Sequence, residues 1–353
     1  MSKEHAVVVG GLGVIGRKLV DYLGRETDWR ITALSRRAPD FASRAEFIAV
    51  DLLDRARAEA TLAPLGDVTH VFYCAFQGRP SWAEHNQPNL AMLMNTVEPI
   101  AKASPRLQHV NLVQGTKYYG CHLGPFKTPA KESDPPHMLP NFYYDQEMWL
   151  RRFQHGKPWS WSALRPHAVC GFALGNPMNL TLVIAVYAAI SRELGLPLRF
   201  PGKPGAFTAL YQVIDAELLA KAMLWAATAK EARNEAFNVM NGDYFRWCHL
   251  WPKFAKFFGM TPGGVQTIPL AEFMADKGPL WAAMQAKYAL KPYRYEDLAA
   301  WPFGDYVFGC DWDIMSDTQK IRRHGFADCV DSEAMFLRLF GEFAAAGAIP
   351  RFD

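Results

Sequence analysis

The chain has 353 residues, of which 50% are apolar types and 21% are charged, a composition that excludes disordered, collagen-like and coiled-coil proteins. Its 38 Lys and Arg residues against 35 Asp and Glu residues leave a net charge of only +3, which argues against nucleic acid as a partner. The longest apolar runs, such as 180–190, are shorter than the ~20 residues that cross a bilayer. With a polar start and no signal peptide, the chain is expected to be cytoplasmic and not to bind a membrane.

The cysteines and histidines give no sign of a metal site or a disulfide framework. The six cysteines are widely spaced and form no C-x-x-C pair, so we predict buried, reduced thiols. The ten histidines lack metal-ligand spacing, and no metal is expected. A chain of this length buries enough surface to fold without disulfides or bound metal ions.

The N-terminal segment is predicted to be a strand, a glycine turn and a helix. A β-branched run at 5–9 indicates the strand, and an amphipathic pattern at 17–23 indicates the helix. The glycines between them have G-x-x-G-x-x-G spacing. Such glycines allow a tight turn and let backbone N–H groups approach the pyrophosphate of a dinucleotide, although an ordinary turn is the alternative. The residues predicted to contact a cofactor here are Gly10, Gly13, Val14, Ile15 and Gly16.

A second strand, at 30–34, ends at Ser35, Arg36 and Arg37. An NAD-binding fold normally places an acid at this position to hold the ribose 2′-OH. Guanidinium groups instead form charge-assisted, often bidentate hydrogen bonds with a 2′-phosphate. We therefore predict NADPH as the cofactor, with a solvated turn as the alternative for the two arginines.

Further strands are predicted at 46–50, 69–73, 109–113 and 160–164, separated by helical segments. This alternation predicts an α/β fold with a doubly wound parallel sheet of the Rossmann type, whose ligand lies beyond the carboxyl ends of the strands. An acid after the third strand could bond an adenine amino group, but a helix cap fits equally well. The residues expected at the cofactor on these strand ends are Asp51, Leu52, Cys74, Ala75, Gln114, Pro166, His167 and Ala168.

The sequence resembles the extended short-chain dehydrogenase/reductase superfamily, in which a catalytic Tyr is followed four residues later by Lys on a helix. That lysine is missing, because Glu147 follows Tyr143 and Met148 follows Tyr144 at this spacing. The motifs are similar to those of one subfamily, the progesterone 5β-reductase and iridoid synthase enone reductases, as a bacterial-type member. The matching segments span about two-thirds of the chain and are 10–16, 35–37, 115–120, 141–147, 161–166, 171–172, 177–179 and 235–238.

The resemblance implies that Tyr143 and Lys117 form the catalytic pair and that Tyr143 also contacts NADPH. It implies reduction of the activated C=C bond of an α,β-unsaturated carbonyl compound, including Δ4-3-ketosteroids such as progesterone. Hydride adds to the β-carbon while the pair stabilises the charge that grows on the carbonyl oxygen. The α-carbon can then take its proton from solvent.

Two departures from the family lie on the nicotinamide and substrate side. His167 and Ala168 stand where plant members usually have Gly-Asn, and the stretch from Lys117 to Tyr143 is shorter. These differences leave the reaction type intact and the substrate open. The residues expected to line the substrate pocket are Tyr119, Phe126, Tyr144 and Met178.

The second half of the chain is rich in aromatic residues and helical patterns. We predict helices at 180–194 and 216–227 and strands at 207–213 and 235–240. Most of the aromatic residues should form core, but an aromatic-rich helical lobe above a parallel sheet also suits a bulky apolar substrate.

The domain organisation follows from these elements. Residues 1–170 are predicted to form the dinucleotide-binding domain, to which the chain returns once, at about 206–240. The ranges 171–205 and 241–353 are predicted to form a smaller, mostly helical substrate-binding lobe.

Three other functions remain open on the sequence. A carbonyl reductase or a sugar-nucleotide epimerase would use the same fold. A non-catalytic regulator that senses NADP would keep the fold without the reaction. The expected partner is a small apolar enone, and the sequence also permits a homodimer.

Overall fold

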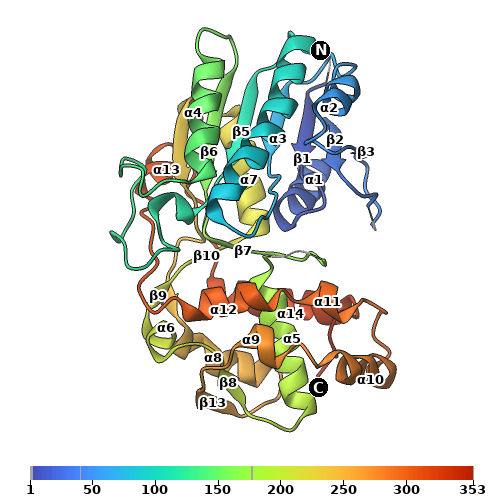
Figure 1. The fold of residues 1–353 in the computed structure, drawn as a ribbon, viewed down its shortest axis with the longest axis vertical. Helices are drawn as coiled ribbons and strands as arrows, with labels where there is room; N and C mark the ends of the chain where they lie inside the picture. Colours follow the sequence, from blue (N-terminus) through green and yellow to red (C-terminus); the bar gives the residue numbers. More distant parts are fainter. Residues whose placement is uncertain (1–2, 40, 176–177, 353) are drawn as a thin grey trace.

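A seven-stranded parallel sheet forms the core of the upper lobe in Figure 1. Its strand order is β11-β6-β5-β4-β1-β2-β3. Because the winding reverses between β3 and β4, the carboxyl ends of β1 and β4 flank a crevice. The structure, a computed structural model, describes residues 3–39, 41–175 and 178–352. The strands are β1 (His5–Val9), β2 (Arg30–Ser35), β3 (Glu46–Ala49), β4 (His70–Tyr73), β5 (His109–Val113), β6 (Ser160–Arg165) and β11 (Glu235–Asn238).

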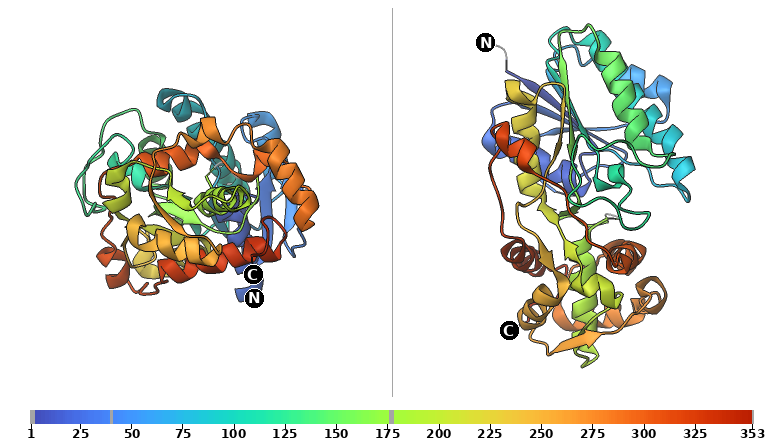
Figure 2. Two further views of the ribbon diagram at one scale, coloured as in Figure 1. Left: turned by 90° about the horizontal axis from the view of Figure 1, so that it is seen from below. Right: turned by 90° about the vertical axis from the view of Figure 1, so that its left-hand side faces the viewer.

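Helices cover both faces of this sheet, as the right-hand view of Figure 2 shows. Successive strand residues point to opposite faces, so Val7 and Val9 pack under α2, α3 and α4, while Ala6 and Val8 pack under α1 and α7. Apolar layers on both faces bury the whole sheet, as parallel sheets require. The elements of this layer are α1 (Val14–Glu26), α2 (Arg55–Leu62), α3 (Trp82–Ala103), η1 (Thr116–Tyr119), α4 (Phe142–Gln154), α7 (Ala216–Thr228) and η2 (Lys230–Ala232).

The predicted doubly wound sheet is confirmed, and its strands agree with the expected ranges to within two residues. The prediction of one continuous strand at 207–213 is wrong, although strand residues occur in its second part. Pro204 begins a helical turn, α6 (Pro204–Thr208), and two short strands follow, β9 (Leu210–Tyr211) and β10 (Val213–Asp215). Proline at a first helical position is already set in the helical φ range, and this local preference prevails over the β-branched and aromatic residues that follow.

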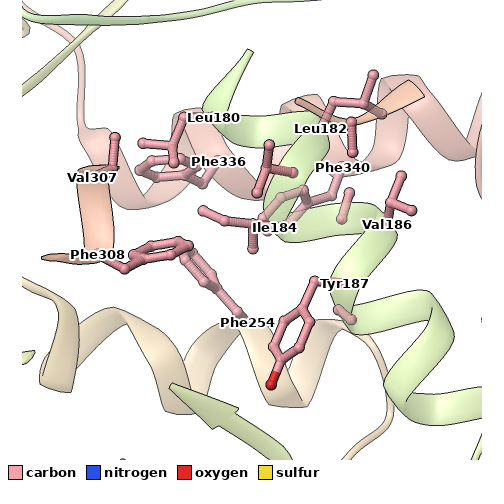
Figure 3. Packing of buried hydrophobic residues seen from close by; sticks show 14 of the residues in the cluster. Leu180, Leu182, Ile184, Val186, Tyr187, Phe254, Val307, Phe308, Phe336 and Phe340 are labelled. Carbon is pink, nitrogen blue, oxygen red and sulfur yellow. The ribbon is translucent and has the colours of Figure 1, made fainter. Parts of the chain in front are cut away.

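The lower lobe in Figure 1 is mostly helical and packs around α5 (Leu180–Glu193). α5 is buried along almost its whole length because apolar residues cover its entire circumference. Figure 3 shows its side chains against Phe254, Phe308 and Phe336. The remaining elements of this lobe and of its connection to the sheet are β7 (Ala168–Cys170), β8 (Leu198–Phe200), β12 (Phe245–Arg246), α8 (Trp247–Phe257), β13 (Pro262–Val265), α9 (Leu270–Phe273), α10 (Gly278–Tyr288), α11 (Tyr295–Leu298), α12 (Trp301–Gly309) and α14 (Ser332–Ala345).

The chain returns to the sheet a second time, which the sequence did not predict. The short helix α13 (Gln319–Arg323) packs beside β11, and Ile321 and Phe326 join the apolar cluster under α1 and α7. A five-residue helix is too short to reveal a period of 3.6 residues in its sequence. Among the described residues, no helix has the length and apolarity that a membrane span requires.

Two buried histidines lie side by side at the amino-terminal edge of the sheet. His70 of β4 is in register with His109 of β5. The His109 ring is hydrogen-bonded to the hydroxyls of Ser160 and Ser162 at 2.9 and 2.8 Å, and the His70 ring stacks on Trp29 at 4.4 Å. Burial lowers the pKa of His70 to about 4 and that of His109 to about 3. Both side chains are therefore neutral in the folded protein at neutral pH.

These two histidines should make the protein acid-sensitive. Unfolding restores a pKa of ~6.5, so below that pH the unfolded state binds more protons and stability falls as the pH drops. Between pH 6.5 and 4.5 each histidine should cost about 2 kcal/mol, measurable by urea denaturation. His109→Asn should flatten the pH dependence by that amount, and the exposed control His155→Asn should not. Equal slopes in both variants would contradict the assignment.

Candidate active site

A cleft of about 270 Å³ lies at the carboxyl ends of β1, β2 and β4. Its floor is the turn after β1, where Gly10 has a φ of 82°, a left-handed conformation that glycine adopts without strain. A Cβ atom on Gly16 would lie 2.2 Å from the Gly10 carbonyl oxygen, so no larger residue fits. α1 begins at this turn with Gly13 as its N-cap and no side-chain cap, which leaves its first N–H groups free for an anion.

Every residue predicted to contact a cofactor in the first three strands and after β4 lines this cleft. Arg36 reaches across to Gln77, with its Nη1 donating to the Gln77 Oε1 at 3.3 Å. Asp54 caps α2 by accepting from the Arg57 N–H, whereas Asp51 faces the cleft. The predicted residues in the lining are Gly10, Gly13, Val14, Ile15, Gly16, Ser35, Arg36, Arg37, Asp51, Leu52, Cys74, Ala75 and Met178.

A smaller cavity, of about 180 Å³, adjoins the cleft and shares Val14, Ile15, Cys74, Ala75, Phe76 and Met178 with it. It lies between the two lobes, because strand ends of the sheet form one wall and α12 forms another. Lys117 and Tyr143, which are 26 residues apart in the sequence, both line it. Gln114, Pro166, His167 and Ala168 complete the predicted set.

One buried side chain joins the segments of Lys117 and Tyr143. Asn141 is the N-cap of α4, and its Oδ1 accepts from the Tyr143 N–H at 3.0 Å. Its Nδ2 donates to the Lys117 carbonyl oxygen at 2.9 Å. A single amide therefore fixes the spacing between η1 and the first turn of α4.

Glu147, at the position of the missing lysine, takes part in a buried ion pair instead. Its carboxylate accepts from the Arg165 Nη2 at 2.8 Å. The Arg165 Nε donates to the Gln114 Oε1 at 3.0 Å, and the Gln114 Nε2 donates to the Tyr143 carbonyl oxygen at 2.9 Å. Because a buried charge without its partner is costly, this network anchors α4 to the ends of β5 and β6.

Burial shifts the pKa values of the two candidate catalytic groups in opposite directions. Desolvation raises the pKa of Tyr143, which keeps its hydroxyl protonated as a hydrogen-bond donor. Desolvation lowers the pKa of Lys117. The hydroxyl passes close to the backbone, since a Cβ atom on Gly115 would lie 3.1 Å from it.

Three residues predicted in the substrate pocket lie outside the cavity lining. The Tyr119 hydroxyl donates to the Asn238 Oδ1 at 2.7 Å and accepts from Arg165, and the Tyr144 hydroxyl donates to the Tyr118 carbonyl oxygen. Both hydroxyls are thus engaged in the protein interior, and Phe126 packs against the same aromatic cluster. Met178, the fourth predicted residue, does line the cavity, whereas Pro177, in the matching segment 177–179, lies outside the described residues.

Several lining residues were not anticipated from the sequence. They come from the loop after β4, the start of α3, the start of α4, β9 and α12, and only Phe142 stands in one of the matching segments, 141–147. Only the general aromatic richness of the second half pointed to those on α12. They are Phe76, Trp82, His85, Phe142, Tyr211, Phe303 and Tyr306.

Comparisons with known proteins agree with this geometry. The model of the PRISE-like Rossmann-fold domain matches residues 46–350. The short chain dehydrogenase gsfE of Penicillium aethiopicum is 33% identical over 99% of this chain and 100% of its own. An (S)-8-oxocitronellyl enol synthase of Nepeta racemosa is 35% identical, and a 3-oxo-Delta(4,5)-steroid 5-beta-reductase of Arabidopsis thaliana is 32% identical, each over 98% of this chain and 93% of its own.

The chain belongs to the PRISE-like Rossmann-fold domain family. The resemblance to the 5β-reductase and iridoid synthase family is thereby confirmed, and with it a short-chain dehydrogenase-like oxidoreductase. Solved structures with the same fold include the UDP-glucose 4-epimerase of Thermotoga maritima, with a TM-score of 0.70 at 18% identity over 97% of this chain and 99% of that one. The UDP-glucose 4-epimerase of Thermus thermophilus has a TM-score of 0.68 at 20% identity over the same shares. At such identities the likeness concerns the fold alone.

The role of Asn141 in this PRISE-like protein can be tested through stability. Asn141→Ala removes a helix cap and a second buried hydrogen bond, so it should lower the free energy of unfolding by about 2–3 kcal/mol. Asp331→Ala removes the N-cap of α14, where the Asp331 Oδ1 accepts from the Ala334 N–H at 2.7 Å, and should cost about 1 kcal/mol. Urea denaturation measures both. A loss in Asn141→Ala no larger than in the control would contradict the bridging role.

Proposed function

We propose that this protein catalyses the NADPH-dependent reduction of the activated C=C bond of α,β-unsaturated carbonyl compounds. The observation that carries the proposal is that Tyr143 and Lys117 line one small, largely apolar cavity that adjoins the glycine-turn cleft. The relatives named as an enol synthase and a steroid 5-beta-reductase support the same class of substrate. A largely apolar cavity whose lining includes the Tyr143 hydroxyl and one ammonium suits a neutral substrate with a single carbonyl oxygen.

The glycine turn and the cleft fit a dinucleotide phosphate, because the turn leaves no room for side chains and the first N–H groups of α1 lack a side-chain cap. NADPH, when bound, supplies the hydride. The glycine turn would hold its pyrophosphate, and Arg36 and Arg37 at the end of β2 would hold its 2′-phosphate.

The protein's own contribution is to stabilise negative charge on the substrate's carbonyl oxygen. The Tyr143 hydroxyl, kept protonated by burial, donates a hydrogen bond that strengthens as the enolate forms, and Lys117 adds a positive charge nearby. The apolar walls make the surroundings less polar than water and so strengthen both interactions. The resulting enolate takes its α-proton from solvent, so the missing helical lysine is not needed.

Enone reduction can be tested by following NADPH absorbance with 2-cyclohexen-1-one, progesterone and 8-oxogeranial, and with saturated ketones as the control. Tyr143→Phe and Lys117→Met should each lower kcat for the enones by about a hundredfold and leave NADPH binding nearly unchanged. Wild-type rates in both variants would refute the assigned roles. Turnover of the saturated ketones alone would indicate a carbonyl reductase, and NADPH binding without turnover would indicate a regulator.

The cofactor preference can be tested at the end of β2. Arg36→Ala plus Arg37→Ala removes both guanidinium groups and should weaken NADPH binding by at least tenfold, since charge-assisted hydrogen bonds are lost. NADH binding should change less than twofold. Titration of each nucleotide against the intrinsic tryptophan fluorescence gives both dissociation constants. An unchanged affinity for NADPH would exclude this site for the 2′-phosphate.

A further inference from the structure

The Lys117 ammonium lies between two aromatic rings that belong to different lobes. Its Nζ is 5.2 Å from the centroid of Trp82, at the start of α3 on the sheet. The same Nζ is 4.7 Å from the centroid of the Tyr306 ring, on α12 of the helical lobe. Both distances fall within the ~6 Å at which a cation is attracted to a ring face. Within the described ranges, Lys117 forms no ion pair with a carboxylate.

The titratable groups around this ammonium are uncharged at neutral pH. Burial raises the pKa of the Cys121 thiol to about 12 and that of Cys310 to about 11. Burial and the lysine charge together lower the pKa of His122 to about 4 and that of His167 to about 3. They also lower the pKa of His85. Lys117 is thus the one residue with a full charge in the described lining of the cavity.

We propose that Trp82 and Tyr306 are positioning residues that hold the Lys117 ammonium between the two lobes while leaving its charge uncompensated. The proposal rests on the role of Lys117 in the proposed function. A carboxylate would also hold the lysine, but it would cancel much of the positive potential at the substrate oxygen. A ring face attracts the cation through its quadrupole and carries no net charge, so the field remains available in the cavity.

Neighbouring rings hold Trp82 in place. Trp82 stacks with Phe142 at 6.3 Å and contacts His122 at 4.2 Å. Phe142 is in turn 4.3 Å from Tyr143. A continuous set of aromatic contacts therefore links the ring that holds the ammonium to the tyrosine that lines the same cavity. Tyr306 belongs to α12 of the helical lobe and lies beside Cys121, which follows η1 on the sheet side, so its contact with Lys117 spans the two lobes.

The test replaces Trp82 and Tyr306 by leucine or by phenylalanine. Each variant is compared in the wild-type protein and in the Lys117→Met variant. With 2-cyclohexen-1-one, Tyr306→Leu and Trp82→Leu should each lower kcat about tenfold, with a smaller change in KM and in NADPH affinity. Tyr306→Phe and Trp82→Phe keep a ring face and should stay within threefold of wild type. In a Lys117→Met background the leucine variants should lower kcat less than twofold, because they act through the lysine. Equal losses in both backgrounds would overturn the proposal in favour of a role in pocket shape.

A second readout does not depend on the substrate. The pH dependence of Lys117 acylation by acetic anhydride, followed by mass spectrometry, reports the pKa of this amine. Loss of a ring face removes a stabilising partner of the ammonium, so Tyr306→Leu should lower that pKa and Tyr306→Phe should not. If the pKa shifts but no enone is reduced, the proposed function fails and the positioning role stands. If enones are reduced but neither the pKa nor kcat responds, the positioning role is wrong.

Discussion

The arrangement of the candidate site depends on the side-chain amide of Asn141. It joins the carbonyl oxygen of Lys117, which follows β5, to the N–H of Tyr143, in the first turn of α4. An asparagine can serve both segments because its amide group is a donor and an acceptor at once. The buried Arg165, at the end of β6, binds Glu147 of the same helix and Gln114, which follows β5. The two candidate catalytic residues, from distant parts of the chain, thus acquire a fixed relation through polar contacts that are costly to break in the interior.

In the proposed function, the positive charge of the site comes from a different element than in the wider superfamily, while the fold is the same. In the wider superfamily the helical position of Glu147 carries a lysine beside the tyrosine. Here it carries an acid that points away into an ion pair with Arg165, while the ammonium comes from Lys117 at the end of β5. Because the carboxyl ends of parallel strands meet at one edge of the sheet, a lysine from a strand end can serve the same cavity as a lysine from the helix.

The cavity combines two properties that seldom occur together, apolar walls and a cation that has no carboxylate partner among the described residues. Such a charge is costly to bury, and the lowered pKa of Lys117 reflects that cost. The ring faces of Trp82 and Tyr306 offset part of it without supplying a negative charge. The nearby thiols and imidazoles are uncharged, so none of them cancels the positive charge of the ammonium.

The sequence alone determined the fold of the sheet and most of the cofactor cleft. Strand periodicity, glycine spacing and the arginines after β2 are local signals, and the topology of a doubly wound sheet brings them to one edge. The second return of the chain at α13, the engagement of Tyr119 and Tyr144 in the interior, and the rings around Lys117 were decided only by the tertiary structure. Those features depend on which side chains meet across the two lobes, and contacts between segments as far apart as residues 82, 117 and 306 leave no periodic pattern in the sequence.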